Sequence, residues 1–95
     1  MTAYAIGSLA VHNLDWQQEY GEKMPASIAR HGGKVLAKSA GVTLVGQTQP
    51  APIKVAIEFD NPAQVRAWYG DPAHDYLRQL RRGKADVDLL LVNGV

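Results

Sequence analysis

The strand-like segments at the two ends of the chain carry apolar side chains at consecutive positions, which limits the folds open to 95 residues. In DVDLLLVNGV at the C-terminal end, Leu89 and Leu91 would point to one side of a strand. Leu90 and Val92 would then point to the other side. YAIGSLAVH at residues 4–12 shows the same two-sided pattern. A sheet built from such strands needs cover on both faces.

The segment that begins at Asp15 is rich in helix formers and carries large side chains at every fourth position, namely Trp16, Tyr20, Met24 and Ile28. This spacing predicts one stripe of a helix that faces the core. Gly21 and Pro25 predict a kink or a restart near residues 21–25, because proline lacks a backbone donor and crowds the preceding turn. Gly32 and Gly33 predict the helix end.

Two further strands are expected in the middle of the chain. KVLAKSAGVTLVG at residues 34–46 alternates imperfectly and predicts a broken or irregular strand with a turn or bulge at Gly41. QTQPAP at residues 47–52 predicts a loop. IKVAIEFD at residues 53–60 alternates clearly, which places Ile57 and Phe59 on one face and Glu58 on the other.

Two capping signals, NPAQ at residues 61–64 and DPAH at residues 71–74, each predict the start of a helix. The first helix would run to Gly70 and the second to Gly83. The side chains expected to face inward are Val65, Trp68, Tyr69, Tyr76, Leu77 and Leu80. His12 and His74 are interpreted as loop and helix-start residues.

The resulting order is β-α-β-β-α-β with a broken second helical unit, in one domain spanning residues 1–95. We expect an α+β, ferredoxin-like fold with a four-stranded antiparallel sheet and its first and third strands in the middle. Right-handed crossovers place both helical units on the same face. Each apolar side chain left in water on the other face would forfeit ~1.5–3 kcal/mol. A two-fold homodimer with sheet against sheet avoids this, the alternative being a monomer with a scattered apolar surface.

Composition excludes several classes of function. The absence of cysteine excludes thiol nucleophiles, disulfides and thiolate zinc sites, and suits the cytoplasm. A net charge of +1 without a dense basic block argues against a nucleic-acid partner. We expect no signal peptide, no membrane association, no metal and no cofactor, since three histidines without H-x-x-x-H spacing give a metal site little support.

His31 stands directly before Gly32 and Gly33, at the predicted helix end. The exposed carbonyls of the last turn would favour its protonated form, and the glycines would provide a left-handed cap. Imidazole also titrates near neutral pH, so His31 is a candidate catalytic acid or base beside a cleft. Both interpretations are open from the sequence.

Glu58 is the second candidate catalytic residue, because a carboxylate on a central strand needs a partner. Arg81 or a tyrosine hydroxyl could provide one. Without a partner, burial would raise the pKa of the carboxyl towards that of a general base. A structural ion pair, within the subunit or across a dimer interface, is the alternative.

The candidate substrate-binding residues are Tyr20, Trp68, Tyr69, Tyr76 and Arg81. The aromatic side chains could line a pocket for a small planar ligand, although aromatic residues at helical spacing also form cores. Arg81, with Arg78 and Arg82, could hold a carboxylate or phosphate. A basic last turn equally complements the helix dipole.

With these elements placed, the sequence resembles a bacterial family of the dimeric α/β-barrel superfamily, domain of unknown function 1330. The resemblance is carried by Tyr4, Tyr20, HGGKVL at 31–36, Gly46, IEFDNPAQVRAWYGDPAHDYL at 57–77, Arg81 and the closing LLLVNGV. It implies a ferredoxin-like fold and a dimer whose two sheets form a barrel-like core. It implies no settled activity.

Related families on this architecture include cofactor-light monooxygenases, muconolactone isomerase-like enzymes and haem-degrading proteins. The haem-degrading type uses an Asn, a Trp and a His, and this chain offers Trp68 and His74 but no Asn in its first strand. A shared fold does not transfer these reactions. Three hypotheses follow: a metal-free enzyme such as an isomerase or monooxygenase, a non-catalytic ligand-binding or stress-associated module, and a purely structural dimer.

Overall fold

The computed structural model describes residues 1–46 and 53–95, so the loop expected at residues 47–52 lies outside the described part. The elements follow the predicted order and are β1 Ala3–Val11, α1 Gln17–Arg30, β2 Lys34–Ala40, β3 Ile53–Phe59, α2 Pro62–Gly70, α3 Pro72–Arg81 and β4 Ala85–Asn93. The second helical unit is broken into α2 and α3, as predicted. The chain therefore has the expected α+β, ferredoxin-like arrangement.

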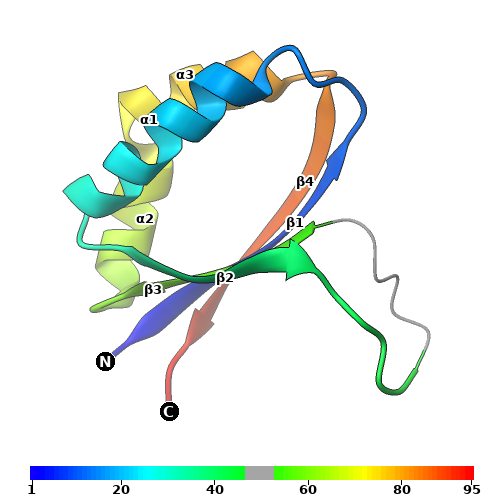
Figure 1. Ribbon diagram of the computed structural model, residues 1–95. Coiled ribbons are helices and arrows are strands. Elements are labelled where there is room, and N and C mark those ends of the chain that lie inside the picture. Colours follow the sequence, from blue (N-terminus) through cyan, green and yellow to red (C-terminus); the bar gives the residue numbers. More distant parts are fainter. Residues whose placement is uncertain (47–52) are drawn as a thin grey trace.

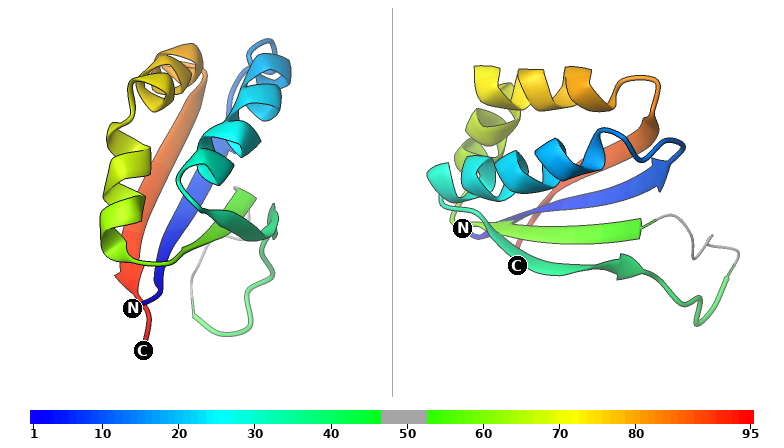
Figure 2. Two further views of the ribbon diagram at one scale, coloured as in Figure 1. Left: turned by 90° about the vertical axis from the view of Figure 1, so that its left-hand side faces the viewer. Right: turned by 45° about the horizontal axis from the view of Figure 1, so that its top comes forward.

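The four strands form one antiparallel sheet in the order β2-β3-β1-β4, with β1 and β3 in the middle. All three helices lie on the same face of this twisted sheet (Figure 1). Views from two other directions show the helical layer on one side only, with the chain termini close together at one end (Figure 2). Residues 41–46, which follow β2, extend away from the body of the molecule (Figure 1).

The inner face of the sheet packs against the helices and forms the core. Ala5 of β1 pairs with Ile57 of β3 and with Leu91 of β4, so these three side chains share the helix-facing side. Small residues along β1 let large side chains of the helices reach the sheet. The buried core comprises Ala3, Ala5, Ile28, Ile57, Phe59, Val65 and Trp68.

The outer face of the sheet carries apolar side chains without cover from the helices. Ile6 pairs with Ala56 on one side and Leu90 on the other, which forms an apolar row across three strands. Leu90 is 65% exposed, Val92 44% and Ile6 37%. The two-sided apolar pattern predicted for the first and last strands is thus confirmed.

The glycine pair after α1 has two different structural roles. Gly32 adopts a φ of 76°, a left-handed conformation in which its backbone N–H caps α1 by donating to the carbonyl of Ala29. Gly33 lies where a Cβ atom would stand 2.6 Å from Ile28 and 2.7 Å from the ring of Phe59. The chain therefore needs glycine at both positions to turn from α1 into β2 against the core.

Both predicted helix starts are confirmed by their caps. The Asn61 side chain accepts a hydrogen bond from the backbone N–H of Gln64 at 2.9 Å, and Asp71 accepts one from Ala73 at 2.8 Å. A proline follows each cap at the first helical position.

Two expectations about side-chain direction are wrong, and one about strand regularity is confirmed. Tyr69 and Tyr76 are exposed rather than inward. The Tyr69 ring lies between Arg78 and the ring of His74, and the Tyr76 hydroxyl donates to Glu19. The second strand agrees with the prediction of a broken or irregular strand, because its register shifts between Val35 and Ala37 and it ends at Ala40, directly before Gly41.

The predicted restart near residues 21–25 is wrong, because α1 is one continuous helix that contains Pro25, and the alternative of a kink stays a prediction. The carbonyl that Pro25 leaves without a donor belongs to Gly21, four residues earlier. Both residues are exposed, so water can satisfy this carbonyl, and Gly21 adds no side chain to crowd the proline ring.

Candidate functional site

A cavity of about 210 Å³ lies between the inner face of the sheet, α1 and α3. Its wall is mostly apolar, because it is formed by the inward positions of all four strands and one side of α1. The lining residues are Gly7, Ser8, Leu9, Tyr20, Gly21, Met24, Pro25, Ile28, Val35, Lys38, Ile53, Val55, Ile57, Trp68, His74, Arg81, Val87 and Leu89. A mostly apolar cavity with a few polar groups is the usual form of a small-molecule site.

Arg81 and Tyr20 form the polar bridge of this cavity. A guanidinium N–H of Arg81 donates to the phenol oxygen of Tyr20 at 2.9 Å, which ties the end of α3 to α1. Arg81 forms no ion pair with the described residues, and no Asp or Glu lines the cavity. The cavity therefore contains a partly buried positive charge without a counter-charge.

His74 lies at the start of a helix, as expected from the sequence, and its side chain is buried in the core. It lies in the first turn of α3 and is 1% exposed. Its ring meets the indole of Trp68 edge-on at 4.6 Å and lies 5.1 Å from the ring of Tyr69. Neither ring nitrogen of His74, nor the indole N–H of Trp68, has a hydrogen-bond partner within residues 1–46 and 53–95.

Burial is the main cause that lowers the pKa of His74 to about 4. The positive charges of Arg81 and Arg78 lower it further, while Asp71 and Asp75 act in the opposite direction. The imidazole is therefore neutral at pH 7, with one N–H donor and one acceptor nitrogen. Buried polar groups are usually hydrogen-bonded, so the unpartnered atoms of this imidazole and of the neighbouring indole, both at the cavity wall, stand out.

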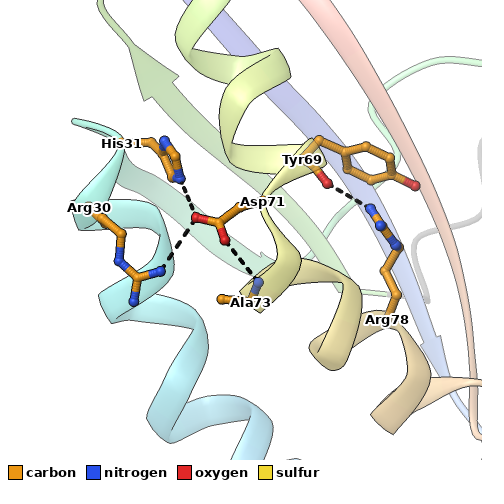
Figure 3. Close-up of polar contacts among 6 residues, drawn as sticks. All are labelled: Arg30, His31, Tyr69, Asp71, Ala73 and Arg78. Carbon is orange, nitrogen blue, oxygen red and sulfur yellow. Dashed lines mark hydrogen bonds and ion pairs between the residues drawn. The ribbon is translucent and has the colours of Figure 1, made fainter.

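His31 lies outside the cavity and joins the end of α1 to the α2–α3 junction (Figure 3). Its Nε2 donates to the Asp71 carboxylate at 2.7 Å, and Arg30 approaches the same oxygen at 3.4 Å. The hydrogen bond from His31, followed by the backbone hydrogen bond from Ala73, lowers the pKa of Asp71 below its ordinary value. This geometry gives His31 a clear structural role, and its catalytic role stays a prediction.

Glu58 lies on the outer face of the sheet, opposite Ile57 as predicted. It pairs in register with Tyr4 of β1 and Lys34 of β2, and it is absent from the cavity wall. His31 and Glu58 therefore do not share one site. The general-base role of Glu58 also stays a prediction, and its position favours a contact on the outer face.

The structure brings together three of the five predicted substrate-binding residues, namely Tyr20, Trp68 and Arg81. Tyr69 lies outside the cavity, with Arg78 over its ring and donating to its carbonyl at 2.7 Å (Figure 3). Tyr76 lies at the outer seam between α1 and α3, where its hydroxyl donates to Glu19 at 2.6 Å. His74 was missed as a site residue, although it stands three residues before the buried Leu77 and so shares its helix face.

Comparison with protein families matches the chain over residues 2–95 to DUF1330, a domain of unknown function. The chain belongs to this family. A comparison with curated proteins gives no match.

Solved structures with the same fold cover almost the whole chain. The RPA0582 protein of unknown function from Rhodopseudomonas palustris is 16% identical and has a TM-score of 0.76. The similarity covers 99% of this chain and 82% of that chain. A dimeric ferredoxin-like protein of unknown function from Jannaschia sp. CCS1 is 10% identical, with a TM-score of 0.76 and coverage of 99% and 100%. SnoaB, a cofactor-independent oxygenase from Streptomyces nogalater, is 12% identical, with a TM-score of 0.69 and coverage of 99% and 93%. At these identities the similarity establishes the fold alone.

Two other features of the described chain bear on function. Its His, Asp and Glu side chains do not gather in groups of three or more that could hold a metal ion. Each helix within residues 1–46 and 53–95 is too short or too polar to span a bilayer.

The buried neutral imidazole predicts a pH-dependent stability that the variant His74→Phe should reduce. His74 binds a proton near pH 6.5 in the unfolded chain and only near pH 4 in the folded protein. Between these values unfolding takes up as much as about one proton at this site, so wild-type stability should fall as the pH falls from 6.5 to 4. Urea unfolding at several pH values should show a shallower decline for His74→Phe. Equal declines in both proteins would contradict the buried neutral state.

Proposed function

We propose that this protein is a homodimer in which each subunit binds one small, mostly apolar organic molecule in the cavity between the helices and the sheet. The observation that carries this proposal is the pair of unpartnered polar groups, the His74 imidazole and the Trp68 indole N–H, at the wall of an apolar cavity. Leaving a buried donor or acceptor without a partner costs ~1–3 kcal/mol. These atoms are not exposed to the cavity as they stand, and a ligand toward which the two side chains turn would recover that free energy.

The size of the cavity supports a compact ligand. Its volume of about 210 Å³ is below that of sites for drug-sized molecules, which start near ~300 Å³. It exceeds the ~150 Å³ of an engineered protein cavity that binds benzene. One substituted ring, or an aliphatic molecule of similar size, fits these limits.

The outer face supports the homodimer. Ile6, Leu90 and Val92 form an exposed apolar surface on the sheet face that the helices leave bare. A two-fold contact would bury this surface on both copies at once. The Jannaschia protein is described as dimeric, and a protein of the same fold from Bacteroides fragilis is described in the same way. The cytoplasmic location expected from the cysteine-free composition is part of the proposal.

Binding is tested by filling the cavity. Val87→Phe adds a ring to the cavity wall, whereas Val42→Phe adds the same ring at an 85% exposed position. Phenol is a suitable probe, followed by the indole N–H signals in NMR spectra. The signal of Trp68 should shift on titration, while that of Trp16, whose N–H donates to the Asn13 carbonyl, should stay in place.

Wild type and Val42→Phe should show the shift, and Val87→Phe should lose it. A wild-type protein that shows no shift of the Trp68 signal with phenol or with other monocyclic probes would contradict the proposal. A Val87→Phe protein that binds as well as the wild type would place the ligand elsewhere.

A second candidate function is proton transfer, because His74, which is neutral at pH 7, lines the same cavity as the cation of Arg81. A neutral imidazole can accept a proton from the carbon next to a carbonyl. The electrons of the broken C–H bond then form a C=C bond, and the π electrons of the carbonyl move onto its oxygen, which gives an enolate. The cation of Arg81 could stabilise that oxygen. The enolate would also offset the positive charges that lower the pKa of His74, so the base becomes stronger as the reaction proceeds.

Proton transfer predicts that the protein accelerates hydrogen–deuterium exchange at the benzylic carbon of phenylacetone in D₂O. General-base catalysis contributes about 10²- to 10⁴-fold, so His74→Phe should remove most of the acceleration. His31→Ala and Glu58→Gln test the roles predicted from the sequence in the same assay. No acceleration by the wild type, together with probe binding, would leave the non-catalytic binding module as the function.

A further inference from the structure

The polar groups of the cavity include more hydrogen-bond donors than acceptors. Trp68 contributes an indole N–H, which can only donate. The phenol oxygen of Tyr20 accepts a hydrogen bond from Arg81. Its O–H can still donate, and no residue in the described part of the chain accepts from it. Neutral His74 adds one donor and one acceptor. A ligand that satisfies this set needs to be rich in acceptors.

The charges of the cavity lead to the same conclusion. Among the residues that the structure describes, Arg81 and Lys38 line it, and no carboxylate does. Other described basic residues do have carboxylate partners. Arg30, Arg78 and Lys84 each form an ion pair, and these pairs lie outside the cavity. A partly buried guanidinium without a counter-charge is costly, and an anionic ligand would remove that cost.

Arg81 also suits a carboxylate in its geometry. One guanidinium N–H is used by Tyr20, and the planar group offers further N–H donors in a fixed fork that matches two carboxylate oxygens. The hydroxyl of Tyr20 lies beside the same group and can donate to the same anion. The apolar wall from Ile53, Val55 and Leu89 would hold the rest of the molecule.

We infer that the cavity recognises a small organic carboxylate, with its acid group at Arg81 and Tyr20 and its apolar body against the sheet. This inference rests on the proposed function, since it specifies the ligand class of the same cavity. It extends that function from a small apolar molecule to an acidic one. It assigns the ligand to Arg81 and not to the neighbouring Arg82, which is exposed and lies outside the cavity.

The test compares benzoate with benzamide, which has nearly the same shape and no charge. Benzoate should bind the wild type more tightly than benzamide. Arg81→Gln should weaken benzoate binding about 10- to 100-fold, as expected for charge-assisted hydrogen bonds, and should leave benzamide binding nearly unchanged. The matched control Arg82→Gln should bind both compounds like the wild type.

Tyr20→Phe removes the second donor and should weaken benzoate binding more than benzamide binding, so the inference is testable even when Arg81→Gln is unstable. Circular dichroism and thermal unfolding establish which variants are folded. Equal binding of the two compounds by the wild type would overturn the inference and leave the cavity as a ligand site. Binding of neither benzoate, benzamide nor phenol would overturn the proposed function and the inference together.

Discussion

The structure depends on one constraint: the strands carry apolar side chains on both faces of the sheet. The chain supplies helices to cover only one of these faces. The inner positions, such as Ala5, Ile57 and Leu91, form the core with α1 and α2. The outer positions, such as Ile6 and Leu90, stay exposed in one subunit. One constraint thus produces the two candidate functional surfaces of the molecule, a cavity on the inner face and an apolar patch on the outer face.

The junction between α2 and α3 places the polar groups of both the scaffold and the cavity. Asp71 caps α3 and holds His31 at the end of α1, which fixes the distance between α1 and the junction. Three residues later His74 turns inward against Trp68, where burial keeps its ring neutral. Arg81, two turns further along α3, returns to α1 through Tyr20. Two polar contacts, His31 with Asp71 and Arg81 with Tyr20, thus connect α1 to the helices that follow β3, and the second of them lies at the cavity wall.

Local chemistry in the sequence predicts most of the fold. The caps Asn61 and Asp71, each followed by proline, locate two helices, and the alternation of residues 53–60 assigns the two faces of the central strand. The candidate site was predicted less well, because a site depends on contacts between distant elements. Tyr76 is exposed because Glu19 on another helix accepts from its hydroxyl, and His74 is buried because Trp68 and Tyr69 enclose it. Helical spacing placed His74 on the face of Leu77, but a polar residue at a helix start is usually solvated.

The central claim is that the outer sheet face is covered by a second copy of the chain. Sedimentation equilibrium of the wild-type protein at micromolar concentration tests it directly. The account predicts a stable dimer, with the mass of two 10.3 kDa chains across the concentration range. A protein that sediments as a single chain at every concentration and remains well folded would contradict it.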